Sequence, residues 1–186
     1  MESQARLTAI MKEKAESVQT IVTGIASLHE AFQQAVAVTK KQGGSTIAAP
    51  GLDESHRGPF RKLCEENGLT LLESNLRDSM SGIHTGFTIA EWGIAETGTL
   101  VQNSTSEDLR IATMLSETHV AVLPESRIRP DSMSLENELS QIMKTPHRYL
   151  SFISGASRTA DIERVLTIGV HGPQELHILI MEETRS

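Results

Sequence analysis

The stretch STIAAPGLDESHRGPFRKLCEENGLTLL, residues 45–72, carries the pattern that decides the fold. It begins with small and β-branched residues at 45–49, which are typical of a short buried strand, and a Pro-Gly pair closes that strand. A helical pattern follows at about 56–67 and stops at Gly68, and residues 69–72 have the pattern of another strand. Strands that alternate with helices in this way predict an α/β protein with a parallel, Rossmann-like sheet.

Upstream of this stretch, residues 1–40 carry an apolar stripe in steps of three and four, which predicts helix. The stripe fits one long helix or two helices that join near Gly24. The helices either pack on the domain's own core or form an arm for a homodimer, because the period is close to that of a coiled coil. We therefore divide the chain into an N-terminal helical segment, 1–40, and an α/β domain, 41–186. The stripe consists of Leu7, Met11, Val18, Ile21, Ile25, Leu28, Phe32 and Ala35.

Downstream, residues 82–104 place glycines among β-forming residues, which predicts short strands around tight turns. Amphipathic patterns predict helices at about 106–116 and 132–144. The remaining apolar runs predict strands at 119–123, 149–154 and 176–181. Taken together, these segments predict an α/β fold with a mixed, Rossmann-like sheet preceded by an N-terminal helix or helices.

Composition narrows the class of protein. A formal net charge of −7 repels phosphates, so we expect no nucleic-acid partner. The one cysteine, Cys64, lies on an apolar helix stripe and forms no internal disulfide, which fits a reducing compartment. An iron–sulfur cluster usually needs four thiolates, so we expect none in this chain. The charged start and the lack of a long apolar run predict a cytoplasmic protein without membrane insertion.

Three glycine-rich turns are candidate sites, and the first is Ala95–Thr99. Glu96 stands beside the turn residues Thr97, Gly98 and Thr99. A tight turn presents such a carboxylate outward and leaves backbone N–H groups free, so Glu96 is a candidate nucleophile or base and its neighbours are candidate ligand contacts. Alternatively, these are solvated residues of a hairpin turn.

The second candidate is the run of small residues that follows the strand at 149–154. Its candidate ligand contacts are Ser154, Gly155, Ser157, Arg158 and Thr159. We predict that a helix starts at 158–165, so that its N-terminus would lie at the carboxyl edge of the sheet and attract an anion. Arg158 could then bind a phosphate or carboxylate through two hydrogen bonds. The alternative is an ordinary helix cap with a surface arginine.

The third candidate is the turn Gly169–Pro173, in which glycines flank His171. A histidine on a stiff turn could donate a proton or bind an anion, although turn histidines are often structural or solvated. The spacing of His171 and His177 does not match a metal site, and no third ligand is evident. We therefore predict no metal, and the sequence identifies no organic cofactor.

These three turns, in this order, resemble the LUD family, in particular the lactate utilization protein C (YkgG-like) group. Residues 93–99, GIAETGT, resemble its I-A-[DE]-T-G-T motif, and residues 153–163, ISGASRTADIE, resemble its I-S-G-P-S-[RK]-T-A-D-I-E segment. Residues 169–173, GVHGP, match its G-V-H-G-P turn. Ala156, where proline is common, and Trp92 are departures from the family pattern.

The resemblance implies a fold of the NagB/RpiA/CoA-transferase-like type. It implies an accessory subunit of an L-lactate utilization system, in which iron–sulfur protein subunits are the partners and lactate is oxidised to pyruvate. A pocket for a small anion or phosphate would lie between the three turns. The fold class also suggests an alternative, a CoA-transferase-like enzyme that acts on a CoA ester or sugar phosphate with Glu96 as nucleophile. Whether the chain is catalytic stays open.

Overall fold

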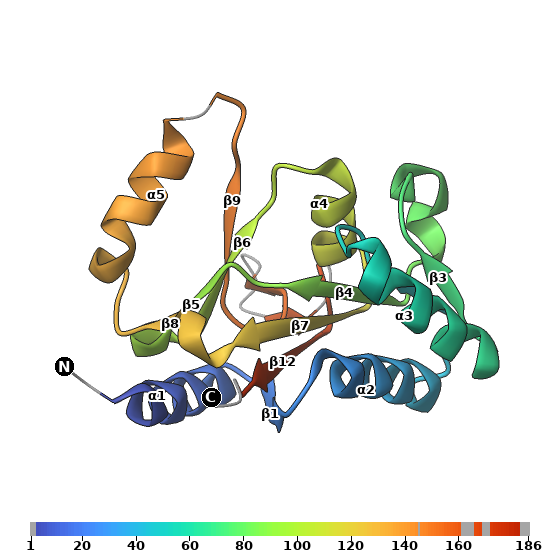
Figure 1. The fold of residues 1–186 in the computed structure, drawn as a ribbon, viewed down its shortest axis with the longest axis horizontal. Coiled ribbons are helices and arrows are strands. Elements are labelled where there is room, and N and C mark those ends of the chain that lie inside the picture. Colours follow the sequence, from blue (N-terminus) through green and yellow to red (C-terminus); the bar gives the residue numbers. More distant parts are fainter. Residues whose placement is uncertain (1–2, 145, 161–165, 169–171, 183–186) are drawn as a thin grey trace.

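The computed structural model describes residues 3–144, 146–160, 166–168 and 172–182, and it has a mixed α/β fold. Within these residues a parallel sheet has the strand order β1-β12-β7-β4-β2-β3. Figure 1 shows the central strands β4, β7 and β12 running through the middle of the molecule. The strands of this sheet are β1 (Ile21–Ile25), β2 (Thr46–Ala48), β3 (Thr70–Leu72), β4 (Thr85–Ile89), β7 (Thr118–Pro124) and β12 (Glu175–Met181).

A smaller sheet packs on one face of the parallel sheet. Its strand order is β8-β5-β6-β9, and β5 and β6 form a hairpin around the turn Ala95–Thr97. Figure 1 shows β9 and the helix α5 (Glu136–Met143) extending together away from the parallel sheet. The strands of the smaller sheet are β5 (Trp92–Ile94), β6 (Thr99–Asn103), β8 (Ile128–Arg129) and β9 (Leu150–Ile153). A separate hairpin pairs β10 (Arg158–Ala160) with β11 (Leu166–Ile168).

Helices cover both faces of the parallel sheet, as its alternating apolar side chains require. On β7, Val120 and Val122 join the core under α2 and α3, where the rings of Phe32 and Phe60 stack at 4.2 Å. The neighbouring Ala121 and Leu123 join the core under α1 and the smaller sheet. The helices are α1 (Gln4–Ser17), α2 (Leu28–Lys41), α3 (Glu54–Glu66), α4 (Glu107–Met114) and α5 (Glu136–Met143).

The predicted mixed α/β fold is confirmed, and of the two alternatives for residues 1–40 the structure has two helices rather than one, but the prediction that they are joined without a strand near Gly24 is wrong at β1. Ile21, Val22 and Thr23 are β-branched, which favours a strand, and β1 pairs in parallel with β12. Ile21 and Ile25 also fit helical spacing, which explains the error. Residues 1–40 therefore contribute two helices and one strand of the parallel sheet.

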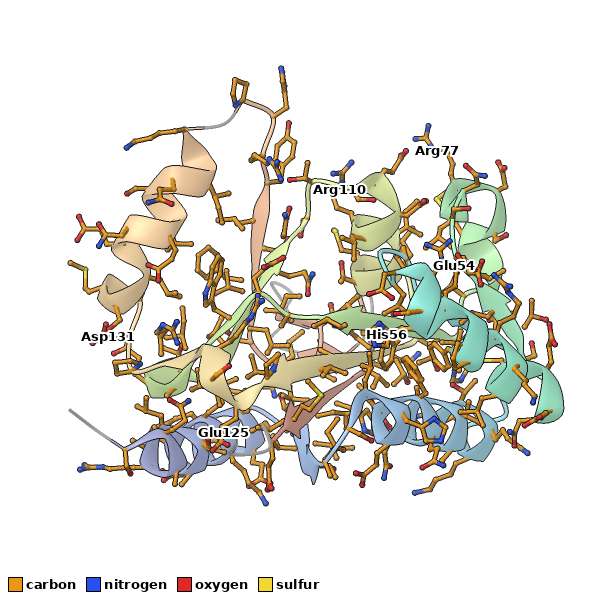
Figure 2. The ribbon with its side chains drawn as sticks, in the orientation of Figure 1. Glu54, His56, Arg77, Arg110, Glu125 and Asp131 are labelled. Atoms are coloured by element: carbon orange, nitrogen blue, oxygen red, sulfur yellow. The ribbon has the colours of Figure 1, made fainter. Side chains whose placement is uncertain are left out.

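The apolar stripe on α1 faces the chain's own core, in agreement with the prediction that the N-terminal helices pack on that core. Leu7, Met11 and Ala15 are buried there against the smaller sheet and β12. The Thr8 hydroxyl donates to Glu125 Oε1 at 2.9 Å, which attaches α1 to the turn after β7. Figure 2 labels Glu125 beside α1. The homodimer that the sequence suggested stays a prediction.

Candidate functional site

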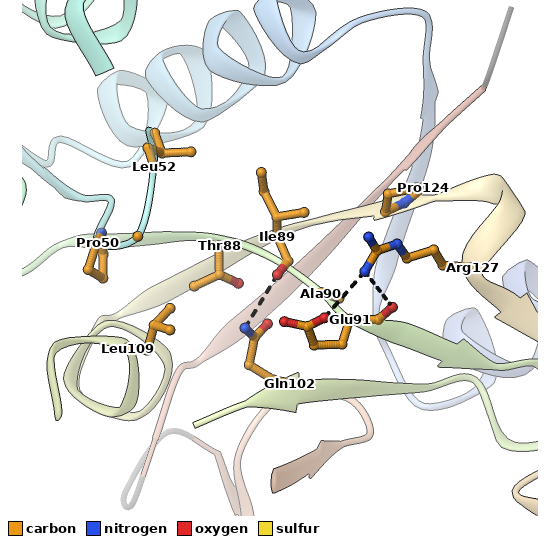
Figure 3. Close-up of a pocket in the computed structure, with 11 residues that line it drawn as sticks. Pro50, Leu52, Thr88, Ile89, Ala90, Glu91, Gln102, Leu109, Pro124 and Arg127 are labelled. Carbon is orange, nitrogen blue, oxygen red and sulfur yellow. Dashed lines mark hydrogen bonds and ion pairs between the residues drawn. The ribbon is translucent and has the colours of Figure 1, made fainter. Parts of the chain in front are cut away.

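A cleft opens where β2, β4 and β7 end, at the carboxyl edge of the parallel sheet (Figure 3). Its volume is about 290 Å³. Residues 50–52 after β2 and 88–91 at the end of β4 line it, together with residues from β6, α4 and the end of β7. Open α/β sheets bind their ligands at this edge, because loops diverge there and leave a crevice.

The loop at 50–52 turns sharply from β2 into α3. Gly51 has a φ of 84°, which a residue with a side chain rarely adopts. Asp53 then caps α3 by accepting a hydrogen bond from the backbone N–H of His56 at 3.1 Å. Arg57 Nη2 donates to the carbonyl of Leu52 at 2.7 Å and holds the loop against the helix. The wall of the cleft is therefore fixed by local contacts.

Two buried polar side chains form part of the floor of the cleft, and each is only 2% exposed. Thr88 lies on β4 and Gln102 on β6. The Gln102 amide donates from Nε2 to the carbonyl of Ile89 at 3.3 Å, while its Oε1 has no hydrogen-bond partner among the described residues. A buried acceptor is usually paired, so this oxygen can accept a hydrogen bond from a donor other than the described residues.

The rim of the cleft carries an ion pair. Arg127 Nη1 lies 3.3 Å from Glu91 Oε2 and donates to the Glu91 carbonyl at the same distance (Figure 3). The two side chains are 48% and 34% exposed, so water screens the pair and it contributes little to stability. Such a pair can exchange one partner for a charged group of a ligand.

A histidine lies behind the floor. His119 on β7 is 1% exposed, and its Nε2 lies 2.8 Å from the Thr88 hydroxyl. Burial lowers the pKa of His119 from 6.5 to about 4, so the ring is neutral at pH 7. Its Nδ1 has no partner among the described residues, and the ring lines a second, smaller cavity of about 70 Å³. Thr88 thus separates the cleft from a buried neutral base.

The first predicted site, the 95–99 turn, lies at the other end of the β5–β6 hairpin. Its glycine, Gly98, has a φ of 64° and contacts the backbone of α1 at Ala15. Glu96 is exposed, its backbone N–H donates to Pro130, and it is not among the residues that line the cleft. The cleft instead begins beside Glu91 and Gln102, at the open end of the hairpin.

The structure does bring the first two predicted turns together. The Thr97 hydroxyl lies 2.7 Å from that of Thr99, and the Thr99 hydroxyl lies 2.6 Å from that of Ser154. The backbone N–H of Ser157 donates to Pro173 at 2.9 Å, which places the third turn next to the second. His171 lies outside the described residues. The ligand contacts proposed for these turns stay predictions.

Two predictions for the second turn are wrong. Residues 158–160 form the strand β10, which pairs with β11 in an antiparallel hairpin whose register places Thr159 opposite Thr167. The turn also lies near the amino edge of the parallel sheet, since Ser157 bonds to Pro173 just before β12 begins. Gly155 packs on the carbonyl of Val18, to which Arg158 also donates a hydrogen bond. No helix N-terminus is present at 158–160 to attract an anion.

The sequence patterns gave no reason to select Thr88, Gln102 or Arg127. One feature of the sequence could have indicated Gln102, because it is a polar residue directly after Leu100 and Val101 in an apolar strand pattern.

Cys64 is fully buried, as predicted, and burial raises the pKa of its thiol to about 12. Within the described residues, no group of three or more potential ligand side chains is placed to hold a metal. No helix in the described ranges is long and apolar enough to cross a membrane.

The fold and the cleft define a Rossmann-like α/β protein with a small cavity at the carboxyl edge of its sheet. The chain belongs to the LUD domain family, whose model matches residues 8–181, and the resemblance of its motifs is thereby confirmed. A solved DUF162 family protein from Deinococcus radiodurans has the same fold, with a TM-score of 0.66 and 17% identity over 97% of this chain and 99% of that one.

Two relatives indicate where in the family the chain lies. It is 25% identical to lactate utilization protein C of Anoxybacillus flavithermus over 97% of this chain and 83% of that protein. It is 37% identical to the uncharacterized protein YkgG of Escherichia coli over 101 residues, which are 53% of this chain and 44% of that protein. These similarities confirm the predicted lactate utilization protein C and YkgG-like grouping.

Proposed function

We propose that this chain is an accessory subunit of a cytoplasmic system that oxidises L-lactate to pyruvate, and that the cleft binds the system's small organic acid. The observation that carries the proposal is the cleft itself, which lies at the carboxyl edge of the sheet and has on its floor a buried oxygen, Gln102 Oε1, without a hydrogen-bond partner among the described residues. The similarity to lactate utilization protein C over nearly the whole chain supports the metabolic context.

Iron–sulfur protein subunits are the partners in this proposal. Oxidation of lactate releases two electrons, and the sequence offers only one cysteine to hold a redox centre. That cysteine, Cys64, is buried and its pKa is raised to about 12, so it is a protonated thiol rather than a thiolate ligand. Electrons would therefore pass through a centre on another subunit.

A small volume and few charges favour an organic acid over a phosphorylated ligand. The cleft holds about 290 Å³, at the lower end of ligand sites, and its charged lining residues are Glu91 and Arg127, which cancel. A phosphate site usually adds several backbone N–H groups or a second cation. The small-anion pocket that the sequence predicted is thus proposed here at a different place from the three turns.

The alternative, a CoA-transferase-like enzyme with Glu96 as nucleophile, has less support. Glu96 is exposed at the turn of the hairpin, outside the cleft. A nucleophile of this kind works best where a cavity excludes water and holds the substrate beside it.

Deleting the gene and restoring it in the same cells tests the proposed function. We expect slow or absent growth on L-lactate as sole carbon source, normal growth on glucose, and recovery with the full chain. Tagged chain purified from lactate-grown cells should carry iron and acid-labile sulfide through its partners. Normal growth of the deletion strain on lactate, with no iron in the purified material, would contradict the proposal.

A further inference from the structure

We infer that the cleft selects a 2-hydroxycarboxylate through a matched donor and acceptor on its floor, the hydroxyl of Thr88 and the side-chain oxygen of Gln102. The inference rests on the proposed function, because it names the class of ligand for the same cleft. Figure 3 shows the two side chains in the same part of the cleft, between Leu109 on one side and Glu91 on the other.

Gln102 supplies the acceptor. Its Nε2 donates to the Ile89 carbonyl at 3.3 Å, and this bond fixes the amide, because the reversed orientation would place two oxygens against each other. Its Oε1 is buried and has no partner among the described residues. The described residues do not give this oxygen the hydrogen bond that it would have in water. A ligand hydroxyl can supply that bond, whereas a methylene or keto group cannot.

His119 makes Thr88 the donor. A neutral imidazole carries one N–H, and an orphaned buried N–H is rarer than an orphaned acceptor. Nδ1 has no partner among the described residues, and apolar side chains such as Met114 and Leu176 line much of the cavity beside the ring. The proton therefore belongs on Nε2, which donates to Thr88 Oγ1 at 2.8 Å. The hydrogen of the Thr88 hydroxyl is then free to point into the cleft, toward a carboxylate.

The rest of the lining fits the same class of ligand. Leu52 and Leu109 offer apolar surface to a short alkyl group, and Arg127 at the rim brings a positive charge toward the carboxylate. The floor residues are nearly inaccessible to solvent, so each hydrogen bond to them discriminates more strongly than it would at the surface. The cleft should hence distinguish a hydroxy acid from the keto acid that its oxidation yields.

Ligand titrations of the purified full chain, by calorimetry or ligand-observed NMR, test this inference. The series is L-lactate, pyruvate, propionate and lactamide, in which the hydroxyl or the carboxylate is changed one at a time. We expect lactate to bind about tenfold more tightly than propionate or pyruvate, because each of these lacks the donor for Gln102. Lactamide, without the carboxylate, should bind more weakly than lactate.

Two variants assign the selectivity to its residues. In Gln102→Leu the lactate-to-propionate ratio should fall to near one, while propionate affinity is kept. In Thr88→Val lactate and propionate should both weaken, because both present a carboxylate. Gln33→Leu, an exposed glutamine on α2, is the matched control and should behave as wild type. Thermal unfolding verifies that each variant folds, and the ligand series on the wild-type chain decides the question if a variant does not.

Equal binding of lactate and propionate to the wild-type chain, or no binding of either, would overturn the inference, as would a Gln102→Leu variant that keeps the ratio. Growth on lactate separates this result from the proposed function. A chain required for that growth but without selectivity keeps the function and loses the inference. If the chain binds lactate selectively but growth on lactate does not require it, the inference holds and the proposed function is wrong.

Discussion

Gly98 and Ala15 lie so close together that a Cβ on Gly98 would overlap the Ala15 nitrogen and come within 2.7 Å of its Cα. Gly98 belongs to the motif by which the sequence resembles its family, and its φ of 64° is also unfavourable for other residues. Glycine is therefore required at this position for a structural reason, because a residue without a side chain lets the hairpin turn lie directly on α1.

The substitution Gly98→Ala should therefore destabilise the fold by about 2–4 kcal/mol, through the strained backbone and the overlap with α1. Gly43→Ala is the matched control, because Gly43 has a φ of 77° with nothing within 4 Å of the added carbon, so only the backbone term of about 1 kcal/mol applies. Urea unfolding monitored by circular dichroism measures both. Equal losses in the two variants would mean that the turn does not pack tightly on α1.

The buried His119 should make stability depend on pH. Its folded pKa is about 4 and its ordinary value is 6.5, so between these values the unfolded chain binds a proton that the folded chain does not. The contribution of the neutral His119 to the free energy of unfolding is therefore fully present above pH 6.5. It is lost as the pH drops toward 4, which lowers the free energy of unfolding by about 3 kcal/mol.

Unfolding free energies at pH 7 and pH 4.5 test this prediction through a comparison of variants. In His119→Gln the difference between the two pH values should shrink, because the group that takes up the proton on unfolding is gone. In His29→Gln, where the replaced histidine is exposed on α2, the wild-type difference should persist. If the two variants show the same difference, another group causes the acid sensitivity.

The thiol of Cys64 should be unreactive in the folded protein. It is fully buried, and desolvation raises its pKa from 9.0 to about 12, so very little thiolate exists at pH 8. We expect Ellman's reagent to label the chain at the rate of unfolding, and to label it completely in guanidinium chloride. Rapid labelling of the native chain would show that α3 opens locally around this residue.

Local pattern predicted most elements of the fold because each depends on residues near it in sequence. The strand and turn at 45–51 and the helix that starts at Glu54 are examples. β1 was missed because its partner, β12, lies some 150 residues later in the chain, and only that pairing favours strand over helix. Apolar spacing alone cannot separate the two.

The candidate site was harder to predict for a related reason. Its floor joins Thr88 from β4 with Gln102 from β6, and its rim adds Arg127 from the turn after β7. None of these residues stands in a glycine-rich motif, and only the order of strands in the sheet brings them together. The motifs that the sequence makes conspicuous instead join the hairpin, the 154–158 loop and α1, as the bond between Thr99 and Ser154 illustrates.

The functional site lies either in the cleft or at the hairpin turn with Glu96. The two locations predict opposite results when variants are expressed in the deletion strain. If the cleft is the functional site, Gln102→Leu should fail to restore growth on lactate although the chain accumulates normally, because its floor no longer offers an acceptor. Glu96→Gln should restore growth fully, because this exposed side chain does not line the cleft. Growth rates on lactate and on glucose, with immunoblots for chain abundance, measure both variants. Loss of growth with Glu96→Gln and recovery with Gln102→Leu would move the site to the hairpin turn and revive a covalent role for Glu96.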